Sequence, residues 1–119
     1  MNELLKAAMQ AEIAAASSAE ARGDVSATFM HLSRAHIISQ RDTGAHVRVH
    51  WLMLRAGIRT RDWHEALGQL PRIVAAGLFS RVWVPPGNTG RSNVSALKPM
   101  PLPDDLRDLF ARASDGHTR

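Results

Sequence analysis

The segment AHVRVHWLMLRAGI, residues 45–58, decides the fold of this 119-residue chain. Its apolar side chains recur at three- and four-residue steps, the period of an α-helix. They form two adjacent rows, which are Ala45, Val49, Leu52 and Ala56 beside Val47, Trp51, Leu54 and Ile58. The outer side carries three arginines, Arg48, Arg55 and Arg59. Asp42 and Thr43 are each available to cap this helix. Such a wide apolar arc predicts a central helix that other helices cover.

Two helices are predicted before this segment. The first spans about residues 3–22 and is rich in alanine, and Asn2 is available to cap it. Gly23 and Asp24 then end the first helix and cap the second. In the second helix, residues 25–40, the apolar side chains fall near one side, namely Val25, Phe29, Leu32, Ala35 and Ile38. We therefore expect the second helix to pack on the first.

A fourth helix is predicted to follow the central one. Asp62 caps it, and it spans residues 63–76, with Glu65 at the capping-box position. Pro71 lies inside this span and is expected to kink or tighten the helix. The four helices thus read as two antiparallel hairpins.

The two hairpins resemble each other, because Asp24 and Asp62 occupy equivalent places 38 residues apart. They are distantly similar to tetratricopeptide helix pairs, whose period is about 34 residues. The small and bulky positions typical of that repeat are not reproduced in the first helices. Two hairpins are too few for a free-standing solenoid, so another element is expected to cap the core.

The last third of the chain differs in kind. Residues 82–103, here called the strap, contain five of the six prolines and exclude a helix over most of their length. Spaced apolar side chains predict that the strap is ordered and packed across the helices: Trp83, Val94, Leu97, Met100 and Leu102. A short C-terminal helix is predicted over residues 104–113, with a flexible tail at 114–119. The expected fold is therefore all-α, with one helical domain over residues 1–113.

Composition excludes several classes of site. Without cysteine, the chain has no disulfide framework, cysteine zinc finger, iron–sulfur cluster or thiol nucleophile. The net charge is only +4, and the pI near 11.0 reflects an arginine-rich chain that lacks Tyr and Cys. Charges of both signs are interspersed, so a nucleic-acid partner is not expected. The six histidines are the compositional feature that points to a site.

Two of these histidines share one side of the central helix. His46 and His50 are four residues apart, which places them about 40° apart with Cβ atoms about 6 Å from each other. Two imidazoles at this spacing can converge on one metal ion. His36, near the end of the second helix and a short loop away, is the predicted third ligand. Three histidines with an open position suit a divalent transition metal, with zinc or nickel favoured.

The other histidines are weaker candidates. His31 is five residues from His36, about 140° around the helix, so both cannot point into one site. His64 begins the fourth helix and is expected to be exposed, although it can approach from the side. His117 falls in the predicted tail. His31 and His64 are therefore only additional candidates.

Two other functions stay open. The hairpins and the strap can form a groove for a protein partner, without a metal, and a homo-oligomer is an option. Alternatively, the histidines act as acid or base on a small anion held at residues 88–91. Asn88, Thr89, Gly90 and Arg91 there combine backbone donors with one cation. No carboxylate shares the histidine row, which disfavours an enzyme.

Several segments together resemble the small bacterial family catalogued as domain of unknown function 3703. They are residues 31–36 (HLSRAH), 46–54 (HVRVHWLML), 87–90 (GNTG), 93–95 (NVS) and 98–101 (KPMP). The resemblance covers about residues 21–106 and implies a cytoplasmic bacterial helical protein. It supplies no activity or cofactor, but it suggests that the histidine segments and the GNTG turn belong to one constellation.

The chain shows no targeting or membrane signal. Its first residues lack a basic region followed by an apolar stretch, and no run of about 18 apolar residues occurs. We therefore expect no membrane span and a cytoplasmic location.

Overall fold

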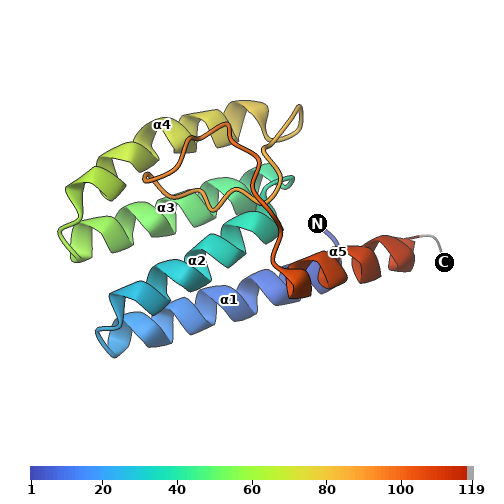
Figure 1. The fold of residues 1–119 in the computed structure, drawn as a ribbon, viewed down its shortest axis with the longest axis horizontal. Coiled ribbons are helices and arrows are strands. Elements are labelled where there is room, and N and C mark those ends of the chain that lie inside the picture. The colour runs from blue at the N-terminus through green and yellow to red at the C-terminus, as the bar shows by residue number, and fades with distance from the viewer. Residues whose placement is uncertain (118–119) are drawn as a thin grey trace.

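The computed structural model describes residues 1–117 and contains five helices (Figure 1). They are α1 (Glu3–Ala21), α2 (Val25–Ser39), α3 (Thr43–Arg59), α4 (Trp63–Phe79) and α5 (Asp104–His117). No strand occurs among these residues, which confirms the all-α prediction. None of the helices in this part of the chain has a segment long and apolar enough to cross a membrane.

Short polar side chains begin the first four helices. Each side-chain oxygen accepts a hydrogen bond of 2.7–3.1 Å from a backbone N–H two or three residues later, and the caps are Asn2, Asp24, Asp42 and Asp62. For α3, the structure selects Asp42 rather than Thr43. These caps satisfy backbone donors that a helix start leaves unpaired, so they fix where each hairpin turns.

The helices pack in pairs, as predicted. α1 lies along α2, α3 lies along α4, and α2 packs against α3 to join the two hairpins. α5 contacts α1 (Figure 1). The core is built mainly from α1, α2 and α3, with two leucines of α5, and its largest members are Met9, Phe29, Leu32, Ile37, Ile38, Val49, Met53, Leu106 and Leu109. Stacking in the tetratricopeptide manner stays a prediction.

A close approach between α3 and α4 depends on a glycine. A Cβ atom added at Gly57 would lie 3.0–3.1 Å from the backbone and Cβ of Ala66. Since nine in ten real Cβ contacts are longer than 3.4 Å, a side chain at Gly57 would require α4 to shift by a few tenths of an ångström. The close approach brings the inner side of α4 within reach of the α3 histidines.

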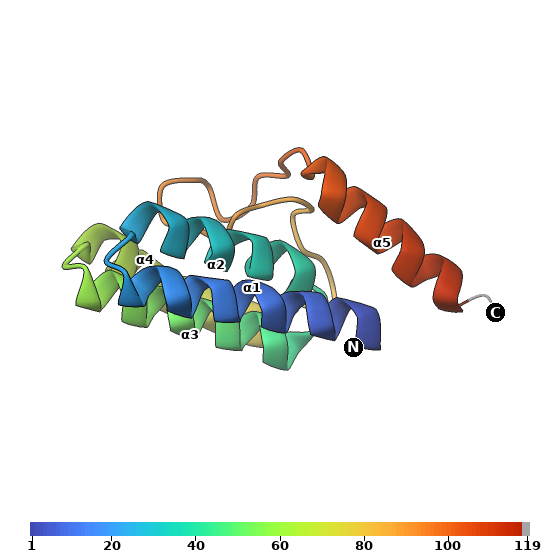
Figure 2. The same cartoon turned by 90° about the horizontal axis from the view of Figure 1, so that it is seen from below.

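The strap folds over the helices and holds neither helix nor strand. Met100 N–H donates to the carbonyl of Pro86 at 2.9 Å, which closes residues 86–100 into a loop. Gln40, directly after α2, donates to the Pro85 carbonyl at 2.9 Å, and Arg72 of α4 donates to that of Val94 at 2.7 Å. Figure 2 shows the strap and α5 on one side of the four-helix layer.

Several predicted details differ from the structure. In the strap, Trp83 and Leu97 are exposed rather than packed on the helices. α4 continues through Pro71 to Phe79, and α5 continues past residue 113 to His117, so part of the predicted tail is helical. Residues 118–119 lie outside the described residues. The central helix is also less covered than expected, because Trp51 and Ile58 are about half exposed. Its second apolar row is therefore divided: Leu54 is buried and Val47 half-buried, whereas Trp51 and Ile58 face outward.

Candidate metal centre

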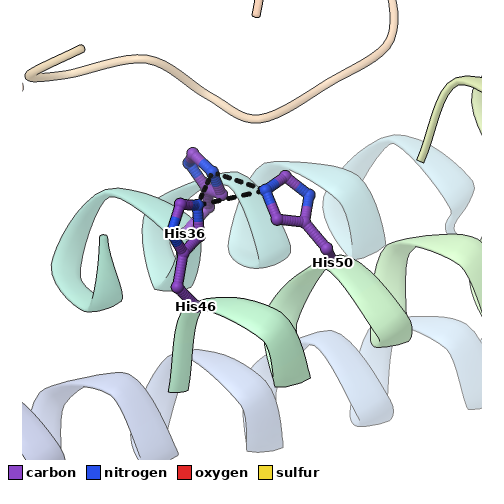
Figure 3. Close-up of side chains that lie close together, drawn as sticks. All are labelled: His36, His46 and His50. Atoms are coloured by element: carbon purple, nitrogen blue, oxygen red, sulfur yellow. Dashed lines mark hydrogen bonds between the residues drawn. The ribbon is translucent and has the colours of Figure 1, made fainter. Parts of the chain in front are cut away.

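Three buried histidines converge between α2 and α3. His36 comes from α2, His46 and His50 come from α3, and each is only 3–6% exposed. Their Nε2 atoms are 2.9 Å apart for His36 and His46 and 3.1 Å apart for the other two pairs. Figure 3 shows the three rings pointing toward one another. These three residues, the histidine cluster, form a group able to hold a metal ion.

Local structure explains the convergence. His46 and His50 are one helical turn apart, so both side chains leave the same side of α3. α2 ends at Ser39 and α3 begins at Thr43, so a very short connector turns the chain back. It places the last turns of α2 beside the first turns of α3, which brings His36 to the pair as predicted.

The Nδ1 atom of His36 is fixed by the strap. It lies 2.8 Å from the backbone carbonyl of Asn88. A carbonyl oxygen only accepts hydrogen bonds. The proton of neutral His36 is therefore on Nδ1, and its Nε2 carries a free lone pair.

The end of α4 fixes the Nδ1 atom of His46 in the same way. It lies 2.8 Å from the hydroxyl of Ser80, and that hydroxyl donates its single proton to the carbonyl of Ala76. Ser80 must therefore accept from His46. The Nε2 of His46 is unprotonated as well.

Gln69 fixes the third ring. Its side-chain NH₂ donates to the Gly90 carbonyl at 2.9 Å, and the carboxylate of Glu65 lies 3.4 Å away. This orients the amide so that its oxygen faces Nδ1 of His50. His50 must then donate through Nδ1, and all three imidazoles take one tautomer.

Burial keeps the histidine cluster neutral. Desolvation lowers the pKa of His46 and of His50 to about 4, and a nearby positive charge adds to this, from the His50 ring for His46 and from Arg72 for His50. The fully buried His36 has a pKa well below its usual value for the same reasons. At neutral pH, three Nε2 lone pairs therefore face one another with no proton between them. A metal cation satisfies all three at once.

The strap closes directly over His36. Gly90 has φ +78°, and a Cβ atom added there would lie 2.5–2.7 Å from three atoms of the imidazole ring. Asn88 is buried and holds this turn together, because its side-chain amide donates to the carbonyls of Ser95 and Lys98 and accepts from Gly90 N–H. The GNTG turn is thus part of the wall of the histidine cluster.

Glu65 does not act as a capping-box residue, so that prediction was wrong. Its carboxylate is 2% exposed and binds the strap through the Arg91 guanidinium and the Ser92 N–H. The Arg91 guanidinium also lies 4.1 Å over the ring of Phe29. The polar groups at 88–91, predicted to hold an anion, are used in contacts within the chain: Asn88 and Gly90 in the turn, Arg91 on Glu65, and Thr89 Oγ1 on Arg91 N–H.

The remaining histidines lie apart from the histidine cluster. His31 Nδ1 is 2.8 Å from the carboxylate of Glu12, which also binds Arg34. His64 is exposed in the first turn of α4. The side chain of His117 lies outside the described residues. Among the histidines whose side chains the structure describes, His36, His46 and His50 are the ones brought together.

A small cavity adjoins the histidine cluster. It measures about 50 Å³ and is lined by the three imidazoles together with Gln40, Arg72, Ala75, Pro85, Asn88, Gly90 and Ala96. A volume of this size holds about two water molecules or one small polar group. An ion bound to the three Nε2 atoms would therefore have room for further ligands.

Sequence reasoning missed Gln69, Ser80 and Arg72. A signal for them exists: Glu65, Gln69, Arg72 and Ser80 recur at helical spacing and form a polar stripe on one side of α4. Glu65, Gln69 and Ser80 are buried. Buried polar side chains on one stripe indicate a site rather than a solvent-facing surface.

The chain was compared with known proteins. No curated protein and no solved structure matches it. A family match covers residues 3–110, nearly the whole chain, and includes the histidine cluster, the inner face of α4 and the strap. The chain belongs to the family described as protein of unknown function (DUF3703).

Proposed function

We propose that this protein binds a divalent transition metal through Nε2 of His36, His46 and His50. One observation carries the proposal: each Nδ1 lies against a group that the surrounding hydrogen bonds leave as an acceptor, the Asn88 carbonyl, the Ser80 hydroxyl or the Gln69 amide oxygen, while the three Nε2 atoms converge. Metal-binding histidines characteristically donate their other ring N–H to a carbonyl or similar acceptor. The histidine cluster has this arrangement three times.

The spacing of the nitrogens favours one group of ions. For an ion about 2.0–2.1 Å from each nitrogen, separations of 2.9–3.1 Å give N–metal–N angles of about 90 to 100°. These angles are nearer to one face of an octahedron than to a tetrahedron. Among the two candidate ions, we therefore favour nickel over zinc, with the remaining positions facing the cavity.

Metal handling or sensing is the role that we propose, in the cytoplasm, rather than catalysis. The cavity beside the histidine cluster has no carboxylate in its wall within the described residues. A general base is therefore not supplied there by Asp or Glu. Buried, prearranged imidazoles favour tight binding over turnover.

Elemental analysis of untagged protein tests the proposal. We expect bound metal after purification, and thermal stabilisation when nickel or zinc is added to chelator-treated protein. Ligand at 100 times its Kd stabilises the fold by about 2.7 kcal/mol, which is a shift of roughly 10 °C for a chain of this size. A His46→Ala/His50→Ala variant should lose the shift and keep its helix content. The matched control, His31→Ala/His64→Ala, should keep the shift.

Absence of metal in the native protein, with no shift from nickel, zinc, cobalt or copper, would overturn the proposal. Retention of the shift by the His46→Ala/His50→Ala variant would do the same.

Self-association is the second function that a specific observation favours. Seven large apolar residues on α3 and α4 are 48–67% exposed and define the α3–α4 apolar face: Trp51, Ile58, Trp63, Leu67, Leu70, Val74 and Leu78. On α4 they follow helical spacing on the side away from Gln69 and Arg72. The strap contacts α4 on that polar side, where Arg72 donates to the Val94 carbonyl and Glu65 accepts from Ser92 N–H.

We propose that a second copy of the chain covers this face. The seven side chains present on the order of 600 Å² of apolar surface. A standard interface buries about 800 Å² per partner, of which roughly 60% is apolar. The α3–α4 apolar face therefore supplies by itself the apolar area that a two-fold dimer needs.

Sedimentation equilibrium tests this second proposal. We expect a dimer in the wild type and a monomer in a Leu67→Glu/Val74→Glu variant. Val25→Glu/Met30→Glu is the matched control, because it places the same charges on exposed apolar positions of α2 and should leave the dimer intact. A wild-type chain that stays monomeric up to submillimolar concentration would refute it.

A further inference from the structure

The Arg72 guanidinium faces the same cavity as the histidine cluster. It donates to the carbonyl of Gly68 at 2.9 Å and to that of Val94 at 2.7 Å. Among the described residues no carboxylate lies within ion-pair distance of it. A guanidinium has five N–H donors, so Arg72 has capacity for a further acceptor in the cavity.

The charge around the cavity is not balanced from within the chain. Glu65 is the acidic group on the same side of α4, but its carboxylate already binds Arg91 and Ser92 N–H. The cavity wall otherwise consists of neutral imidazoles, amides and small residues. A divalent ion on the histidine cluster would add two positive charges beside that of Arg72. Buried charge of one sign is costly unless it is paired.

We propose that the site binds a small carboxylate-type anion together with the metal, one oxygen on the ion and another on Arg72. This inference rests on the proposed metal site. A carboxylate or bicarbonate carries two acceptor oxygens on one carbon, so one oxygen can bind the ion while the other accepts a charge-assisted hydrogen bond from Arg72. The cavity of about 50 Å³ has room for a group of this size. Pro85, Ala75 and Ala96 provide the apolar wall beside it.

Cobalt(II) is the probe for the test, because its visible spectrum reports its ligands. Acetate or bicarbonate added to the cobalt-loaded wild type should change the spectrum with saturation. Binding of the anion and of cobalt should strengthen each other, and thermodynamic linkage requires that the factor be the same in both directions. We expect this coupling to be at least tenfold. Phosphate, which is bulkier and tetrahedral, should produce a much weaker change.

Variants at Arg72 separate the anion from the metal. Arg72→Gln should bind cobalt at least as tightly as the wild type, since a nearby positive charge is removed, and should lose tenfold or more in anion affinity. Arg72→Lys, which keeps the charge, should retain part of the anion affinity. Arg48→Gln, on the exposed side of α3, is the matched control and should behave as wild type.

The outcomes distinguish the two levels of the proposal. Cobalt that binds the wild type without any anion effect on spectrum or affinity would overturn this inference and leave the metal site standing. Failure of the wild type to bind cobalt, nickel or zinc would overturn both. Unchanged anion affinity in Arg72→Gln would overturn the role of Arg72. Equal affinity for phosphate and acetate would overturn the assignment of the anion class.

Discussion

Gly90→Ala should damage the histidine cluster from the strap side. The new Cβ atom would lie 2.5 Å from Cδ2, 2.6 Å from Cγ and 2.7 Å from Nε2 of His36, whereas ordinary contacts begin at 3.4 Å. Either the ring or the strap must therefore move by nearly 1 Å. A non-glycine residue at φ +78° adds about 1–2 kcal/mol, and overpacking of a buried site adds about 1–3 kcal/mol.

We therefore expect Gly90→Ala to lower the free energy of unfolding by about 2–5 kcal/mol. Metal ligands tolerate displacements of about 0.2 Å, so a shift of His36 Nε2 near 1 Å should weaken metal binding by at least 100-fold. Urea denaturation of chelator-treated protein measures the first effect. Calorimetric titration with nickel measures the loss of metal affinity.

Gly23→Ala separates backbone strain from the clash. Gly23 has φ +73° and nothing within 4 Å of the position of an added Cβ, so it carries the same conformational penalty in open space. This control should lose only about 1–2 kcal/mol and keep its nickel affinity. If Gly90→Ala lost no more stability than Gly23→Ala, the close packing of the strap on His36 would be refuted.

Three further predictions concern the surroundings of the histidine cluster. Because burial lowers the pKa of His46 and His50 to about 4, the unfolded chain binds more protons than the folded one below pH 6.5. The metal-free protein should therefore lose stability as pH falls from about 6.5 to 4, by about 2 kcal/mol per imidazole at pH 5. A urea midpoint that stays constant between pH 7.5 and 5 would contradict this. Glu65→Gln leaves Arg91 without its carboxylate and should cost about 3 kcal/mol, seen as a lower urea midpoint at unchanged m-value; a loss under about 1 kcal/mol would show that the pair is solvated. Gln69→Leu removes the acceptor of His50 and should weaken nickel binding about 10- to 100-fold, and unchanged affinity in calorimetry would argue against the tautomer assignment.

Local signals predicted most of the fold. Asn2, Asp24 and Asp62 were recognisable as caps because a cap needs only a short polar side chain ahead of an apolar periodicity. The His46 and His50 pair followed from helical spacing alone. His36 required one more step, that a short connector turns α2 back onto α3, and the structure brings it to the pair.

The supporting residues were not predictable in the same way. Asn88, Gly90 and Gln69 meet the histidines across 19 to 54 residues of sequence, and periodicity carries no information about contacts that distant. Glu65 was misassigned because it stands three residues after Asp62, where a capping box is expected. The backbone half of that motif forms, since Glu65 N–H donates to Asp62, but the side chain turns toward the strap instead.

α4 reverses the usual pattern of a surface helix, and this reversal links the two proposals. Its polar stripe, with Glu65 and Gln69, is turned inward, while Leu67 and Val74 on its other side face solvent. Folding stability alone favours the opposite, because apolar burial stabilises and buried polar groups are costly unless fully bonded. A substitution of one residue of the inward stripe leaves the groups that it hydrogen-bonds unpaired, so single substitutions there are destabilising. The stripe is explained by what it holds: Gln69 contacts the His50 ring, and Glu65 binds the strap that closes over His36. The outward leucines and valine of α4 fit the proposed dimer, in which a second chain covers this surface.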